Sequence, residues 1–328
     1  MKKAKRFLGF FMLLPAFVFA QLNDTISKED VKNTLEYLAS DQLKGRANYS
    51  KELNTAANFI AGQFSKDFLQ TYPGSYTYFQ PFMVKRGSEI SAVDTNGKYD
   101  PSKTLLNVIG VLKGRSLANE CVIFSAHYDH IGTEASNGDY IFNGANDDAS
   151  GVTALLALAH YYSQKNDNER TLIFCAFSGE ELGLYGSTYF AEKLKPDSIV
   201  AVINIEMIGM HNVAGKNAFY LTGSHYSDLN KIMKANLKGS TVKIVGEASV
   251  VKRLFQRSDN YPLALKGIPA HTIMCSDDDD PCYHSTCDEA ERINIDNMTN
   301  IIRSIPVAVR TLVDGSQKPQ RIKVSRIE

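Results

Sequence analysis

Short apolar runs of strand length alternate with helical segments over most of this chain. Alternation of this kind favours a mostly parallel sheet that is covered by helices on both faces. With 328 residues, 44% of them hydrophobic, the chain can form one large α/β domain or two small ones. From these patterns we expect strands at 121–126, 171–177, 199–206, 217–222 and 269–275, and helices at 148–163, 182–193, 226–238 and 295–313.

The N-terminal third and the tail have less regular patterns. Residues 28–66 are expected to be helical, with a capping start at Ser27, and a second helix is expected from Lys51 to Phe68. Strands are expected at 76–92 and 104–113. The segment after Gly315 is polar, so we expect it to be frayed.

The first twenty residues are typical of a secretory signal peptide. Basic residues at 2–6 precede an apolar stretch at 7–19, and Val18 and Ala20 stand at −3 and −1 before Gln21. A membrane anchor is the alternative interpretation. We therefore expect residues 21–328 to be periplasmic or secreted, where disulfides persist. The formal net charge of zero gives no electrostatic reason to bind nucleic acid, or a membrane after cleavage.

Five residues at or beyond the ends of apolar runs are candidate metal ligands: His127, Asp147, Glu181, Glu206 and His284. In open α/β sheets, ligands gather at the carboxyl ends of the strands. Two imidazoles and three carboxylates suit a pair of divalent metals that share one carboxylate. Such a pair, about 3.5–4 Å apart, activates water and stabilises both oxygens of a hydrolytic transition state.

Neighbouring residues suggest supporting roles. Asp129 lies two positions after His127, on the same face of a strand, and is expected to accept the second imidazole N–H. Asp148 supports Asp147, although one acid here would also serve as a helix N-cap. Glu180, beside Glu181, is the candidate general base and acid, whereas the simpler alternative is two charges in a first helical turn.

The region around His284 adds three further expectations. Tyr283 can donate a hydrogen bond to a developing oxyanion. The four aspartates at 277–280 are expected to form a solvated loop, with attraction of a cationic substrate group as the alternative. Of the cysteines clustered there, Cys282 and Cys287 are the preferred disulfide pair. His130 is interpreted as a structural residue.

Together, these segments resemble the co-catalytic dizinc exopeptidases, a family that includes the bacterial leucyl-type aminopeptidases and has glutamate carboxypeptidases and glutaminyl cyclase as relatives. Weaker matches are Gly45-Arg46, 107–110 and 257–259. The main matching motifs are 126–132 (AHYDHIG), 144–151 (GANDDASG), 176–187 (AFSGEELGLYGS) and 283–285 (YHS).

The resemblance implies a single-domain three-layer α/β/α sandwich with a mixed, mostly parallel sheet, with N-terminal helices at 28–68 and a catalytic core at about 100–315. It also implies two zinc ions, one held by His127 and Glu206 and the other by Glu181 and His284, with Asp147 bridging them. Asp147–Asp148 would be a cis peptide bond, and Arg257 falls where some members contact substrate.

The implied function is a secreted zinc aminopeptidase that acts on peptides with a free N-terminus, with a water molecule between the metals and Glu180 as general base. Two departures from the family pattern are Glu206, where Asp is usual, and Asn260-Tyr261-Pro262, where His-x-Pro is usual. The alternatives are a glutaminyl cyclase with one zinc, a carboxypeptidase that cleaves dipeptides, and a binding protein without metal.

Overall fold

A computed structural model describes residues 25–84, 89–92, 100, 102–134, 139–247 and 250–327. The expected signal peptide, residues 1–20, lies outside these ranges. Within them, no helix combines the length and the apolar character that a membrane span needs.

The centre of the molecule is a ten-stranded mixed sheet with the order β11-β10-β12-β9-β5-β8-β4-β2-β3, in which β1 also pairs with β4. The central strands β12 (Ala270–Met274), β9 (Ile199–Ile205), β5 (Leu117–His127) and β8 (Arg170–Phe177) run parallel. Antiparallel pairing adds β4 (Leu105–Leu112), β2 (Phe79–Val84), β3 (Ile90–Ala92), β1 (Gln70–Thr71) and β10 (Ala218–Leu221), and β11 (Lys243–Ile244) is parallel to β10. The predicted mixed sheet is confirmed, with its parallel order at the centre.

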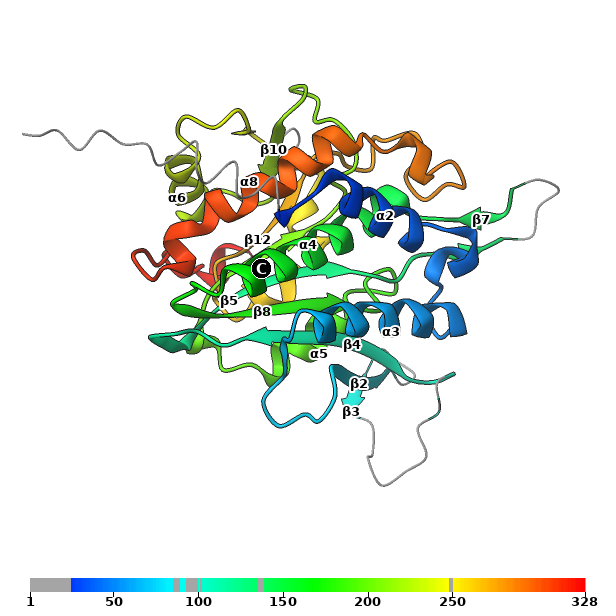
Figure 1. Cartoon of the computed structure of the whole chain (residues 1–328), viewed down its shortest axis with the longest axis horizontal. Helices are drawn as coiled ribbons and strands as arrows, with labels where there is room; N and C mark the ends of the chain where they lie inside the picture. Colours follow the sequence, from blue (N-terminus) through cyan, green and yellow to red (C-terminus); the bar gives the residue numbers. More distant parts are fainter. Residues whose placement is uncertain are drawn as a thin grey trace, which may run out of the picture.

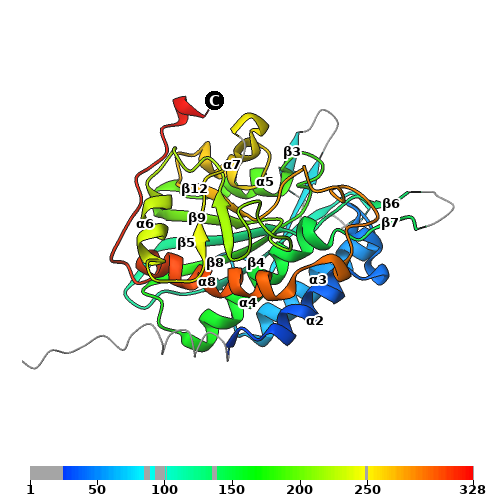
Figure 2. The same cartoon turned by 90° about the horizontal axis from the view of Figure 1, so that it is seen from above.

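Helices cover both faces of this sheet (Figures 1 and 2). One face carries α2 (Lys28–Leu38), α3 (Lys51–Lys66), α4 (Ser150–Lys165) and α8 (Ile295–Val313), and α6 (Leu229–Asn236) packs beside α8. The other face carries α5 (Tyr185–Lys193) and α7 (Asn260–Ala264). The three-layer α/β/α architecture is therefore confirmed.

Alternation along the central strands builds two separate cores. On β5, Val122 and Phe124 are buried in the core beneath α4, whereas Ile123 between them is buried in the core that contains Phe190 of α5 and Leu263 of α7. Successive side chains of a strand point to opposite faces, so a strand buried on both faces is apolar without interruption. This double burial fixes the register of β5 and therefore the position of its last residue, His127.

Two helices begin later than expected because special backbone precedes them. Residues 145–149 form a π-helical turn, η2, that contains a cis peptide bond between Asp147 and Asp148, so α4 begins at Ser150. The predicted cis bond is confirmed. Before α5, Gly179 and Leu184 adopt positive φ angles of 76° and 60°, which turn the chain after β8 instead of continuing it into a helix.

Three expectations about the ends of the chain are wrong. A 3-10 segment at Asp41–Arg46 interrupts the helical stretch expected at 28–66, and the stretch expected as one strand at 76–92 contains two antiparallel strands, β2 and β3. The segment after Gly315 is not frayed: it runs from α8 toward α7 (Figure 2). Ile322 and Ile327 are buried in the core on that side, where they pack with the residues of α7. Burial of these two apolar side chains holds the segment against the sheet.

Candidate metal centre

The candidate ligands converge at the carboxyl ends of the parallel strands. His127 is the last residue of β5, Glu206 directly follows β9, and Glu181 lies in the turn after β8. Asp147 comes from η2, in front of α4, and His284 from the long loop after β12. This is the edge of an open sheet at which ligands bind in α/β proteins.

Asp147 lies between the two histidines. One of its carboxylate oxygens, Oδ1, is 3.1 Å from Nε2 of His127, and the other, Oδ2, is 3.3 Å from Nε2 of His284. The same His284 nitrogen is 3.1 Å from Oε2 of Glu181. An aspartate that offers one oxygen to each side has the geometry that a bridging ligand requires.

His130 also belongs to this group, although its motif gave no sign of it. Its Nδ1 lies 2.8 Å from Oε1 of Glu181, and its side chain is buried. Ligand atoms of His130, Asp147, Glu181 and His284 all lie within 4.8 Å of one another. The interpretation of His130 as purely structural was therefore too narrow. Its position three residues beyond the end of β5 was the available signal.

Glu206 lines the same cavity but is turned toward another partner. Its carboxylate accepts a short hydrogen bond from the hydroxyl of Ser258, which also lies 2.9 Å from Oγ1 of Thr272. In the part of the chain that the structure describes, the only group with three or more possible ligands besides the one above is Asp277, Asp278 and Asp279, so Glu206 does not complete such a set with His127 and Asp147.

Unpaired nitrogen atoms show that these residues fit a metal. Nε2 of His127 and Nε2 of His284 are buried without a hydrogen-bond partner, and both face the Asp147 carboxylate. Buried polar atoms without partners are costly, and a cation between imidazole and carboxylate satisfies both sides at once. Imidazole nitrogens combined with carboxylate oxygens are ligands that zinc accepts.

Asp129 does not play the expected part. Its carboxylate is 3.9 Å from Nδ1 of His127, and it is the main-chain carbonyl of Asp129 that lies 3.1 Å from that nitrogen. The carboxylate instead accepts the backbone N–H groups of Glu180, at 3.2 Å, and Glu181, at 3.3 Å. By accepting both of these N–H groups in the turn after β8, Asp129 positions both glutamates.

Asp148 connects the segments around the candidate ligands. Its carboxylate accepts the backbone N–H groups of His127, at 3.3 Å, Gly151, at 2.9 Å, and Met207, at 3.2 Å. These groups belong to β5, α4 and the chain after β9, so one buried side chain joins three segments. Burial raises the pKa of Asp148 well above its usual value, and the nearby Glu206 carboxylate adds to this shift.

The adjacent glutamates have opposite electrostatics. Burial, reinforced by the carboxylates of Glu206 and Asp259, raises the pKa of Glu180 well above its usual value. Burial and Asp147 would also raise the pKa of Glu181, but the nearby imidazoles of His130 and His284 outweigh them and lower it. Neighbouring carboxyl groups whose pKa values are pushed apart are a common sign of divided acid–base roles.

A cavity opens beside these glutamates, and the remaining candidates line it. The Tyr283 ring stacks on His284 at a centroid distance of 3.9 Å, and Arg257 forms an ion pair of 2.7 Å with Asp278. The apolar part of the wall comes from Met207, Leu254 and Met274. The full lining is Asp147, Glu180, Glu206, Met207, Leu254, Arg257, Met274, Asp278 and Tyr283.

The aspartate loop is not simply solvated. The ammonium group of Lys252 lies 2.9 Å from Asp277, 2.8 Å from Asp278 and 2.6 Å from Asp279, measured to carboxylate oxygens. The fourth carboxylate, Asp280, pairs with Arg292. Lys252 lies close in the chain to Leu254 and Arg257, which line the cavity, and it pairs with Asp278, which also lines it. These ion pairs therefore connect two parts of the cavity wall.

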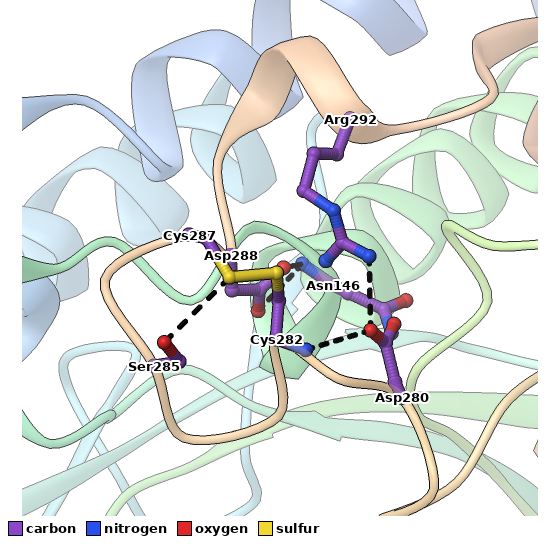
Figure 3. Close-up of a disulfide and its surroundings, with 7 residues drawn as sticks. All are labelled: Asn146, Asp280, Cys282, Ser285, Cys287, Asp288 and Arg292. Carbon is purple, nitrogen blue, oxygen red and sulfur yellow. Dashed lines mark hydrogen bonds and ion pairs between the residues drawn. A yellow bond between two sulfur atoms is a disulfide. The ribbon is translucent and has the colours of Figure 1, made fainter.

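The predicted disulfide between Cys282 and Cys287 is confirmed, and it closes the short loop that carries His284 (Figure 3). Within the described residues, Cys121, Cys175 and Cys275 are free. Burial raises the pKa of the Cys275 thiol, as expected for an inert core residue.

Comparison with known proteins agrees with this geometry. Residues 107–308, a span that contains all five candidate ligands, match Peptidase family M28. The chain belongs to this family. The resemblance to the zinc exopeptidases is thereby confirmed at the level of the family.

The M28 relatives include zinc peptidases. A protein described as "Probable zinc metalloprotease" from Pyrenophora teres f. teres (strain 0-1) is 29% identical over 192 residues, which cover 57% of this chain and 38% of the relative. "Aminopeptidase YwaD" from Bacillus subtilis (strain 168) is 24% identical over 230 residues, which cover 68% of this chain and 48% of the relative. This M28 chain thus spans less than half the length of either relative.

Solved structures share the fold at low sequence identity. The LapA aminopeptidase of Legionella pneumophila has a TM-score of 0.66 and 20% identity, covering 94% of this chain and 78% of that one. The zinc aminopeptidase BSAP from Bacillus subtilis has a TM-score of 0.66 and 15% identity, covering 88% and 96%. A glutaminyl cyclase from Bacteroides thetaiotaomicron has a TM-score of 0.65 and 17% identity, covering 89% of this chain and 99% of that one.

Proposed function

We propose that this M28 protein is an exported zinc aminopeptidase that removes N-terminal residues from peptides. The observation that carries the proposal is the pair Glu180 and Glu181 at one edge of the cavity. Glu181 is paired with two imidazoles and has a lowered pKa, whereas Glu180 is held apart with a raised pKa. One glutamate is thus suited to hold a metal and its neighbour to move a proton.

We assign His127, Asp147 and Glu206 to one zinc ion and Asp147, Glu181 and His284 to a second, with His130 beside Glu181. Zinc at such a site polarises a carbonyl group and lowers the pKa of water. Glu180 then accepts the proton of the attacking water and passes it to the leaving amine. Tyr283, which lines the cavity, donates a hydrogen bond to the developing oxyanion.

The lining of the cavity supports a substrate with a free N-terminus. The carboxylates of Asp147, Glu180 and Glu206 surround it, and such a wall favours a protonated amine. Arg257, on the same wall, is placed to contact the peptide. A carboxypeptidase would instead need unpaired cationic groups for the terminal carboxylate, and Arg257 is already paired with Asp278.

Metal content and a substrate panel test the proposal together. Purified protein is assayed for zinc and for hydrolysis of amino-acid amides with free and with blocked N-termini, including a Gln substrate. Two zinc ions with cleavage of free-amine substrates only are the expected result. Absence of a bound divalent metal, or of turnover by the metal-loaded protein, would contradict it.

A glutaminyl cyclase is the second candidate, because Asp147, Glu181 and His284 form a ligand group without Glu206. That function predicts one tightly held zinc ion and turnover only of N-terminal Gln.

Variants test the individual roles. Glu180→Gln should keep its metal while kcat falls by about 10²- to 10⁴-fold, because general base catalysis contributes that much. Glu192→Gln, which removes a charge from the exposed face of α5, is the matched control and should retain full activity. Asp147→Ala should lose metal. Activity in Glu180→Gln, or two bound metals in Asp147→Ala, would show that the assignments are wrong.

A further inference from the structure

The disulfide-closed loop touches the metal centre at two points. His284 lies inside the loop, between Cys282 and Cys287, and Asp288 directly follows the second cysteine. Figure 3 shows the Asp288 carboxylate hydrogen-bonded to Asn146, close to the disulfide. Asn146 precedes Asp147, so the loop reaches the ligand that both histidines face.

Asp288 satisfies three consecutive backbone amides of η2. Its carboxylate accepts the N–H of Asn146, at 3.0 Å to Oδ1 and 3.1 Å to Oδ2, and the N–H of Asp147, at 3.1 Å. Its main-chain carbonyl accepts the N–H of Ala145, at 3.0 Å. The residue is 2% exposed, so water does not share this task.

The residue in front of η2 offers no side-chain acceptor to these amides. The residue before η2 is Gly144, which has no side chain to cap the turn. The first N–H groups of a helical turn need acceptors from outside the turn. A carboxylate supplied by a segment 141 residues later in the chain meets this need, and it fixes the backbone of Asp147 itself.

We propose that Asp288 is a positioning residue of the metal centre: it acts through the backbone of Asp147, and the Cys282–Cys287 disulfide joins it to His284. The positions of Asp147 and His284, which come from distant parts of the chain, are thereby fixed relative to each other. The inference rests on the proposed zinc site, because it concerns the ligands of that site. Groups that orient metal ligands typically change metal affinity by about 10- to 100-fold.

The direct test is zinc affinity, measured by competition with a chelator on the purified full chain. Asp288→Ala should bind zinc at least about tenfold more weakly than the wild type, because the Asp147 backbone loses its acceptor. Asp288→Asn keeps one carbonyl oxygen and should recover part of the loss. Glu291→Gln removes a charge from an exposed position in the same segment and should bind like the wild type.

Cobalt(II) spectra separate positioning from a general loss of stability. In Asp288→Ala, the visible bands of the bound cobalt should shift, because the ligand geometry changes, whereas Glu291→Gln should keep the wild-type spectrum. Replacement of both Cys282 and Cys287 by Ser should weaken zinc binding. Asp288→Asn should then reduce zinc affinity less in the variant without the disulfide than in the wild type, because the disulfide and Asp288 act on the same loop. This double variant also serves if Asp288→Ala fails to fold.

The outcomes distinguish this inference from the proposed function. A wild-type chain that binds no zinc would overturn the proposed metal centre itself. Wild-type zinc affinity and an unchanged cobalt spectrum in the folded Asp288 variants would overturn the positioning role while leaving the zinc site in place. Full additivity of the cysteine and Asp288 effects would show that the loop does not couple them.

Discussion

Replacement of Arg46 by Met should show how much the stability of the fold around the candidate metal centre depends on a residue far from it in sequence. Arg46 is 1% exposed, and its guanidinium donates to the carbonyl oxygens of Tyr128 at 2.9 Å, Asn143 at 2.7 Å and Gly144 at 2.9 Å. A fourth bond goes to the carbonyl of Leu38. Tyr128 follows His127, and Gly144 precedes η2, so Arg46 joins the backbones of two ligand segments.

The size of the effect follows from these four acceptors. Each buried carbonyl left without a donor costs about 1–3 kcal/mol, so the gross loss is about 4–12 kcal/mol. Part of it is offset because the variant no longer buries a charge, and burial already lowers the pKa of Arg46 against the pull of the nearby aspartates. We expect a net loss of about 3–5 kcal/mol, a large share of the roughly 5–15 kcal/mol that stabilises a typical domain.

Urea unfolding of the metal-free protein measures this loss. Arg46→Lys should lose nearly as much, because one ammonium group cannot span four carbonyls. Arg303→Met is the control: its guanidinium is partly exposed and donates to the carbonyl of Ile26, so we expect a smaller loss of about 1 kcal/mol. A loss in Arg46→Met no larger than that in Arg303→Met would refute the reasoning.

Two further predictions concern charge. Burial lowers the pKa of His271 to about 4, below the unfolded value of about 6.5. The contribution of the neutral imidazole to the free energy of unfolding is therefore complete above pH 6.5 and is lost as the pH falls toward 4, because the unfolded chain takes up the proton first. Unfolding free energies of wild type and His271→Asn should therefore converge by about 3 kcal/mol over that range, and parallel curves would contradict this. Lys252→Met should raise KM about three- to tenfold with kcat nearly unchanged, since Asp278, which lines the cavity, and its neighbours Asp277 and Asp279 lose their shared cation. Exposed Lys216→Met is its control, and a change in kcat alone would exclude this role.

The strands and the ligands could be predicted because each depends on few residues. The strands β5, β8 and β9 are apolar runs buried on both faces. The ends of these strands determine the positions of His127, Glu181 and Glu206, which lie at or just beyond them. Chemistry then selects the ligands, because an imidazole or a carboxylate at the end of a buried strand needs a partner.

The starts of α4 and α5 were misplaced for a local reason. The cis bond at Asp147–Asp148 and the positive φ of Leu184 are backbone conformations that hydrophobic periodicity does not report. The C-terminal tail was misjudged because only three of its described residues, Pro319, Ile322 and Ile327, are buried, which is too few to produce a hydrophobic period.

The partners of the bracing residues escaped prediction for a different reason, which also explains how the centre is organised. Arg46, Asp129 and Asp288 bond mainly to backbone groups, and a backbone group leaves no trace in the sequence of its own segment. Each brace crosses from one loop to another, so its partner is defined only once the sheet has brought the loops together. The candidate ligands therefore sit on segments whose main chains are held by these braces, and such preorganisation lets a site built from distant segments hold its geometry.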